Sequence, residues 1–166
     1  MKKGTSVHAH LATPNDLDSR GRQAIASALN TLVADAFALF IKTKNYHWHA
    51  SGCHYRDYHL LFDEQANQIF NMIDVLAERV RKLGHTTLRS IEHIHHLQTI
   101  QDDNEEFVES RVMLKNLLED NKAYVVRMRA VHQACDEHND VATASVLEVF
   151  IDETERRVWF LFETQL

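Results

Sequence analysis

Proline and glycine are scarce in this chain, whose 166 residues include one proline and four glycines. Pro14 and Gly21 precede the first long apolar-periodic segment, Gly52 interrupts the pattern, and Gly84 closes the next segment. From residue 85 to residue 166 there is no glycine or proline at all. Because these two residues are the main interrupters of helices, their scarcity in a chain that is 45% apolar predicts an all-α domain.

The chain also lacks a basic excess, a long apolar run and a cysteine motif. It has 18 basic and 24 acidic residues, a net charge of −6, which argues against a domain that reads duplex DNA through its body. We find no apolar run of about eighteen residues and no secretory signal, so we expect no membrane span and a cytoplasmic location. Cys53 and Cys135 follow no metal-binding or redox spacing, and we expect both thiols to be reduced.

Apolar residues recur at the period of an α-helix in four long segments. Residues 1–20 are polar and predict a short flexible arm, and residues 21–166 form the domain. The predicted helices begin near residues 25, 55, 104 and 141, with Ile41, Leu60 and Phe70 among the inward positions. The histidine-rich connection from about residue 84 to residue 104 is long enough to run the length of a bundle and to include a short helix. The pattern predicts a four-helix bundle with one long crossover between its second and third helices.

Five side chains have the chemistry and the spacing of metal ligands. They are His47, His59, Asp63, Asp74 and Glu78, and the last four form two i,i+4 pairs that each share one helix face. If the first two helices form a hairpin that turns at Gly52, His47 and His59 lie ~8 and ~10 Å from the turn and face each other. A mixed imidazole and carboxylate set suits Fe(II), and also Zn(II) or Mn(II).

The two i,i+4 pairs are too far apart to hold one ion within a single chain. Asp74 and Glu78 follow His59 and Asp63 by 15 residues, which is ~22 Å along a helix. Two explanations remain open. The acids are solvated surface residues, or they complete the site of a neighbouring subunit in a two-fold dimer with antiparallel second helices.

Three segments of the sequence resemble the signature of the Dps mini-ferritins: KNYHWHASG (44–52), YHLLFDE (58–64) and IDVLAERVRKLG (73–84). The ending VWFLFE (158–163) extends this similarity along the domain. The resemblance implies a ferritin-like four-helix bundle that assembles into a shell of twelve subunits, with ferroxidase centres at its two-fold interfaces.

The resemblance also assigns functions to individual residues. It implies that His47, His59 and Asp63 of one subunit bind iron together with Asp74 and Glu78 of its partner, with Glu78 bridging two iron positions and Trp48 beside the site. The implied reaction is oxidation of Fe(II), preferentially by hydrogen peroxide, followed by storage of ferric oxyhydroxide. Zn(II) is a possible surrogate for the iron.

Two departures from the family pattern affect the expected partners. The arm has only three basic residues, Lys2, Lys3 and Arg20, so we expect DNA binding to be weak or absent. Near the start of the fourth helix, where the family often has acids lining a pore for iron, Ser145 stands at a common aspartate position. Asp140 and Glu148 are the remaining candidates for that pore.

Other histidine and acidic patterns are weaker. Glu92 and His95 fit one ExxH motif of larger di-iron proteins, but those proteins need two. His93, His95 and His96 could bind a metal adventitiously, although exposure to solvent is the simpler interpretation. Two alternative functions stay open: a nucleoid protein that protects DNA mainly by coating it, and an isolated bundle that carries oxygen or acts as a structural partner, with its acids unpaired.

Overall fold

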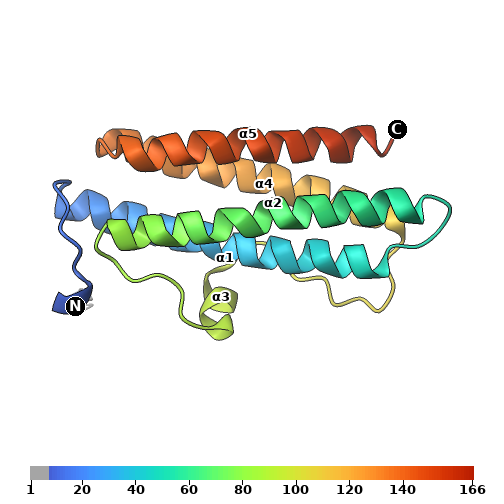
Figure 1. The fold of residues 1–166 in the computed structure, drawn as a ribbon, viewed down its shortest axis with the longest axis horizontal. Helices are drawn as coiled ribbons and strands as arrows, with labels where there is room; N and C mark the ends of the chain where they lie inside the picture. The colour runs from blue at the N-terminus through green and yellow to red at the C-terminus, as the bar shows by residue number, and fades with distance from the viewer. Residues whose placement is uncertain (1–7) are drawn as a thin grey trace.

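The computed structural model describes residues 8–166 and contains five α-helices with no strand in that range. They are α1 (Ser19–His49), α2 (Tyr55–Lys82), α3 (Ile91–Leu97), α4 (Ser110–Glu137) and α5 (Val141–Glu163), preceded by a single 3-10 turn at Ala9–Leu11. Helices α1 and α2 form one hairpin, and α4 and α5 form a second. The crossover that contains α3 connects the two hairpins and runs back along the outside of the bundle, beside α1 and α2 (Figure 1). The four-helix bundle with a short helix in its long crossover is therefore confirmed.

The helices begin and end where local chemistry stops the chain from continuing. Asp18 caps α1, since its carboxylate accepts a hydrogen bond from the backbone N–H of Gly21 at 2.8 Å. Gly52 and Gly84, with φ of +97° and +80°, lie just beyond α1 and α2 in a backbone region that side chains disfavour. The predicted positions of these two helix ends are correct to within a few residues.

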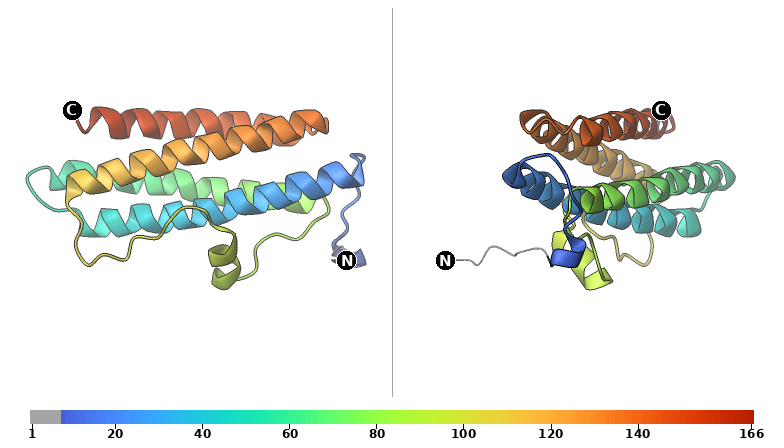
Figure 2. Two further views of the ribbon diagram at one scale, coloured as in Figure 1. Left: turned by 180° about the vertical axis from the view of Figure 1, so that it is seen from behind. Right: turned by 60° about the vertical axis from the view of Figure 1, so that its left-hand side comes forward.

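Leucine, isoleucine and aromatic side chains from all four long helices fill the interior. Each fully buried leucine or phenylalanine contributes roughly 1.5–3 kcal/mol relative to an exposed one. The largest buried apolar residues, all at most 1% exposed, include Ile25, Leu29, Leu32, Leu39, Tyr46, Phe62, Ile69, Met72, Leu76 and Tyr124. Figure 2 shows the two hairpins as two layers, with α3 outside the α1–α2 layer.

Helix α4 begins at Ser110, later than the start expected near Asn104. The carboxylate of Asp103 accepts a short hydrogen bond from the hydroxyl of Tyr46, which anchors this part of the crossover to α1. At the first turn of α4, the hydroxyl of Ser110 donates to the carbonyl of Ser51 at 2.8 Å. These tertiary contacts override the helical propensity of the intervening residues.

Three residues expected to face the core are exposed instead. Ile41, Leu60 and Phe70 are 57%, 51% and 54% exposed, so the prediction of their inward orientation was wrong. The apolar surface of α1 and α2 is wider than the strip that α4 and α5 cover. The excess apolar surface lies on the side of α1 and α2 that faces away from the second hairpin.

By length and composition, α1 is apolar enough to cross a membrane, contrary to the expectation that the chain has no such stretch. More than half of the relevant part of α1 is buried inside the bundle. A central helix of a bundle needs this composition because neighbouring helices surround it. The apolar character of α1 is thus accounted for by its place in the core.

Residues 8–18, which belong to the predicted N-terminal arm, lie against the end of α2. Arg81 donates from Nη2 to the carbonyl of Leu11 at 3.0 Å, and Asn15 donates to the carbonyl of Lys82 at 3.4 Å. The basic residues Lys2 and Lys3 lie outside the described residues.

Candidate metal centre

The end of α1 and the start of α2 meet at a tight reversal of the chain. Only residues 50–54 separate the two helices, and Gly52 supplies the positive φ of this turn. Nothing lies within 4 Å of the position of a Cβ on Gly52, so its backbone conformation alone makes glycine suitable here. The reversal places the last turn of α1, with His47, beside the first turns of α2, with His59.

His47 and His59 form a reciprocal pair. Their rings stack with centroids 3.8 Å apart, and Nδ1 of each ring lies 2.8 Å from the backbone carbonyl oxygen of the other residue. A carbonyl oxygen can only accept, so each Nδ1 must be the protonated nitrogen that donates. In the neutral form of each ring, Nε2 then has a free lone pair, which is the form of imidazole that binds a metal ion.

Asp63 is the third predicted ligand of this half-site, and its carboxylate forms an ion pair with a lysine. Oδ1 of Asp63 lies 3.8 Å from Nε2 of His47 and only 2.7 Å from Nζ of Lys44. The hydrogen bond from Lys44 lowers the pKa of Asp63, and the charge of Lys44 and the nearby imidazoles act in the same direction. An incoming cation must therefore compete with Lys44.

Sequence reasoning did not single out Lys44. It precedes His47 by three residues and so shares its helix face, which is the signal that could have identified it.

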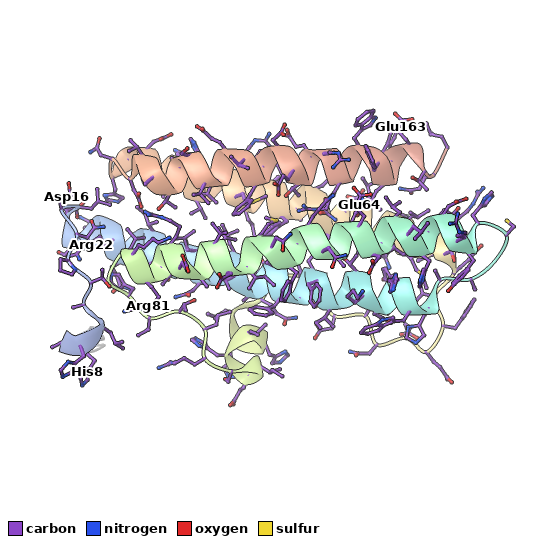
Figure 3. The ribbon with its side chains drawn as sticks, in the orientation of Figure 1. His8, Asp16, Arg22, Glu64, Arg81 and Glu163 are labelled. Carbon is purple, nitrogen blue, oxygen red and sulfur yellow. The ribbon has the colours of Figure 1, made fainter. Side chains whose placement is uncertain are left out.

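Asp74 and Glu78 do not join the histidines within one chain. Both are exposed, and Glu78 instead pairs with Lys82 at 2.9 Å. Figure 3 labels Glu64 and Arg81, which lie towards opposite ends of α2 near Asp63 and Glu78 respectively. Among the described residues, no group of three or more His, Cys, Asp or Glu side chains is arranged to hold a metal ion.

The three predicted carboxylate ligands of α2 nevertheless share one stripe of that helix with exposed apolar residues. Steps of three or four residues connect positions 60, 63, 67, 70, 74 and 78, so all of them project from one face. That stripe combines four polar side chains with two large apolar ones, and every member is exposed or half-exposed. Its members are Leu60, Asp63, Asn67, Phe70, Asp74 and Glu78.

Two aromatic residues flank His47 and differ in their surroundings. Trp48 is 60% exposed, whereas Tyr46 is 1% exposed. The Tyr46 hydroxyl donates to Asp103 and accepts a hydrogen bond from Asn116 at 2.9 Å. Burial raises the pKa of Tyr46, so its phenol is protonated at neutral pH.

The interior of the bundle is unsuited to a cation. The guanidinium of Arg157, at 1% exposure, donates to Asn121 Oδ1 at 3.0 Å and to Thr154 Oγ1 at 2.6 Å, both neutral partners. Burial lowers the pKa of Arg157 to about 10, which still leaves it charged at neutral pH. A buried positive charge repels iron from the position where many four-helix bundles hold a di-iron centre.

The ExxH pair and the histidine cluster lie outside the bundle on α3. Glu92, His95 and His96 are exposed, and His93 is half-buried. No second ExxH motif faces this one, so the pair cannot form the centre that larger di-iron proteins build from two long helices.

The two acids predicted to line a pore differ sharply. Asp140 is 3% exposed and caps α5, accepting from the backbone N–H of Thr143 at 3.0 Å and from Nη2 of Arg79 at 3.1 Å. Its carboxylate therefore has a structural function in the chain. Glu148 is 67% exposed, and its carboxylate lies 3.2 Å from Nε2 of His132.

Comparison with known proteins supplies the family context for this geometry. A family model described as a ferritin-like domain matches residues 26–165. The DNA protection during starvation protein 1 of Deinococcus radiodurans is 32% identical over 171 residues, which cover 97% of this chain and 83% of the relative.

Solved structures agree with these sequence matches. DpsC from Streptomyces coelicolor superposes with a TM-score of 0.89 at 27% identity, covering 93% of this chain and 90% of its own. A Dps protein from Vibrio cholerae, titled a member of a broad superfamily of ferritin-like diiron-carboxylate proteins, gives a TM-score of 0.87 at 26% identity. That match covers 93% of this chain and 98% of the Vibrio chain.

Proposed function

The chain belongs to the Dps branch of the ferritin-like family, and from this premise we propose that it oxidises and stores iron at centres shared between two subunits. The proposed ligands are His47, His59 and Asp63 of one subunit with Asp74 and Glu78 of the other. The ferritin-like diiron-carboxylate superfamily supports iron as the substrate.

The stripe on α2 is the observation that carries this proposal. It presents three acids and two large apolar residues on one face, with Asp63 towards one end and Glu78 at the other. Large apolar side chains that are exposed on the same helix face favour an interaction site there. A two-fold axis across this face, with the two copies of α2 antiparallel, would bring each Asp63 end against the partner's Glu78 end.

Two of the proposed carboxylate ligands form ion pairs within the chain, and in both pairs the other residue is a lysine. Lys44 neutralises Asp63, and Lys82 neutralises Glu78. Both lysines are on flexible side chains and can swing away when iron supplies the positive charge. We propose that these lysines keep the two carboxylates ionised before iron binds and prevent them from repelling each other across the interface.

The proposed reaction balances with two irons at each centre. Two Fe(II) ions each give one electron to hydrogen peroxide, the O–O bond breaks, and two protons are taken up to form two water molecules. The two electrons arrive together, so no hydroxyl radical is released. The imidazoles contribute neutral Nε2 donors, and the carboxylates contribute negative charge, which stabilises the more highly charged ferric product over Fe(II).

Storage and assembly complete the proposal. Twelve copies of the 19.3-kDa chain would form a shell of about 230 kDa that encloses ferric oxyhydroxide. We place the shell in the cytoplasm, where its two free cysteines would stay reduced. Glu148 is the exposed candidate for guiding iron inward, and Trp48 is exposed beside His47, where it could donate an electron to stray oxidant.

DNA coating is the second candidate function, since the relatives are named for DNA protection. Of the arm's basic residues, only Arg20 lies in the described part of the chain, and Asp18 next to it binds His138 at 3.3 Å. We therefore propose that DNA is protected mainly through removal of iron and peroxide, with direct binding weak or absent.

Anaerobic oxidation of Fe(II) by hydrogen peroxide tests the proposed function. Ferric absorbance and protein-bound iron are followed together, with iron and peroxide in buffer as the control. We expect rapid oxidation at about two irons per peroxide, with the iron remaining in solution with the protein. Oxidation no faster than in buffer, with precipitation of the iron, would reject the proposal and favour DNA coating or a structural function.

A further inference from the structure

A cavity of about 500 Å³ lies away from the candidate metal centre, at the other end of the α1–α2 hairpin. It is bounded by the N-terminal segment, the first part of α1, the beginning of the crossover and α3. Figure 3 labels His8, Arg22 and Arg81 at this end of the molecule. A volume of this size suits a small ligand.

The lining of the cavity has the chemistry of an anion site. Arg89 provides a guanidinium, and His8, His85 and His93 provide three imidazoles. Among the described residues, no aspartate or glutamate lines the cavity, although the chain as a whole carries a net charge of −6. Since no cluster of metal ligands is formed here either, the histidines are better suited to donate hydrogen bonds than to hold a metal ion.

Cations outside the lining add to the positive field. Burial lowers the pKa of His85, and the charges of Arg22 and Arg81 lower it further. Arg81 also fixes the geometry, because it donates from Nη1 to the carbonyl of His85 and from Nη2 to that of Leu11. The N-terminal segment is thereby held against the beginning of the crossover.

Two lining residues have buried polar atoms with no hydrogen-bond partner. They are Nδ1 of His93 and Oδ1 of Asn30. The amide of Asn30 is oriented by its Nδ2, which donates to the carbonyl of Thr86 at 2.9 Å. Oδ1 of Asn30 therefore needs a donor, and a buried polar atom left without one is costly.

We propose that this cavity binds inorganic phosphate. The oxygens of the phosphate would accept from Arg89 and from the imidazoles. Its P–OH group would donate to Oδ1 of Asn30. Sulfate and the phosphodiesters of DNA have no such hydroxyl group at neutral pH, and phosphate monoesters, with a second pKa of about 6, have mostly lost theirs, so the site discriminates against all three.

Isothermal titration of the iron-free, fully assembled protein with inorganic phosphate tests this assignment. Arg89→Gln removes the guanidinium, and Ser27→Leu fills the cavity from an exposed position on α1 without changing the charge. Arg129→Gln is the matched control, because that arginine is 54% exposed and lies outside this cavity. Circular dichroism and size-exclusion chromatography confirm that each variant is folded and assembled.

We expect saturable binding of about one phosphate per chain, weakened at least tenfold by Arg89→Gln, abolished by Ser27→Leu and unchanged by Arg129→Gln. Sulfate, adenosine monophosphate and a short DNA duplex should compete poorly with phosphate at neutral pH. Absence of saturable binding, equal binding by all variants, or equal affinity for sulfate would each overturn the proposal. Because the titration is carried out without iron, its outcome does not depend on whether the protein oxidises iron.

Discussion

His47 and His59 each direct Nδ1 to the backbone carbonyl of the other residue, at 2.8 Å in both directions. His47 lies in the last turn of α1, where helix carbonyls lack helical partners, so its carbonyl is free to accept this bond. The pair fixes both tautomers and both ring orientations before any metal binds. Hydrogen bonds of this kind commonly orient imidazole ligands in metal sites.

Replacement of His47 by alanine removes one Nε2 donor and the ring that stacks on His59, whereas His59 keeps its hydrogen bond to the backbone carbonyl of residue 47. We expect His47→Ala to slow rapid Fe(II) oxidation at least about a hundredfold, since loss of even an orienting partner costs 10–100-fold. His49→Ala is the control, because Nδ1 of His49 bonds to Asn45 within its own helix at 2.8 Å. Stopped-flow absorbance measures the rates, and equal slowing in both variants would contradict the assignment.

Removal of Lys44 should free the carboxylate of Asp63 for metal. We expect Lys44→Gln to bind Zn(II), a redox-inert probe, several-fold to about tenfold more tightly, where tenfold corresponds to about 1.4 kcal/mol. Lys122→Gln is the control, since Lys122 pairs with Glu119 on the surface at 2.9 Å. Calorimetric titration at pH 7 gives both affinities, and weaker binding by Lys44→Gln would show that Lys44 assists the metal.

The contribution of the Lys44–Asp63 ion pair to stability depends on pH. Because the folded-state pKa of Asp63 is below its ordinary value of 3.8, the contribution of the pair to stability is present above that value. It is lost as the pH falls through the lowered pKa. The difference in melting temperature between wild type and Lys44→Gln should therefore be constant above about pH 5 and disappear in stronger acid. The effect is small, since Asp63 is 42% exposed.

Gly84 and Gly52 make a matched pair of positive-φ glycines. Alanine in this backbone region costs roughly 1–2 kcal/mol at either position. At Gly84 the added Cβ would also lie 2.8 Å from the carbonyl oxygen of Thr13, whereas at Gly52 it meets open space. We expect Gly84→Ala to lower the free energy of unfolding more than Gly52→Ala. Chemical denaturation compares them, and equal losses would contradict the packing of Thr13 on Gly84.

Asp140 should matter for stability more than for iron traffic. Asp140→Ala removes the cap of α5 and leaves Arg79 unpaired, at an expected cost of about 3–5 kcal/mol for a buried pair. Asp136→Ala, at a position 63% exposed, is the control and should change stability little. Thermal unfolding measures both. If Asp140→Asn slowed iron uptake while leaving stability unchanged, the pore function predicted from the sequence would regain support.

The sequence predicted the fold well where helix signals were local. The bounds of α2 follow from its apolar period and from Gly84, and α5 starts at the position expected from the polar run before it. The start of α4 could not be predicted, because it depends on Asp103 meeting Tyr46 across the fold. The orientation of Leu60 and Phe70 failed for a related reason: apolar periodicity does not reveal which neighbour will cover a helix face.

The candidate site was predictable in part. Their spacing and the expected turn at Gly52 predicted that His47, His59 and Asp63 lie close together, and the structure places them side by side. The lysine on Asp63 was not anticipated, because many side chains on a helix surface can reach an acid. Whether Asp74 and Glu78 join the site depends on a second subunit, which the fold of one chain does not determine.

Subunit complementation tests most directly the central claim that each centre draws ligands from two chains. Shells of His59→Ala and of Glu78→Ala are each expected to have lost rapid Fe(II) oxidation. Dissociation, mixing and reassembly of the two should generate interfaces in which one of the two centres has all of its ligands. We predict partial recovery, towards one quarter of wild-type activity for random pairing at each interface. Inactive shells, shown by mass spectrometry to contain both variants, would contradict a centre shared between subunits.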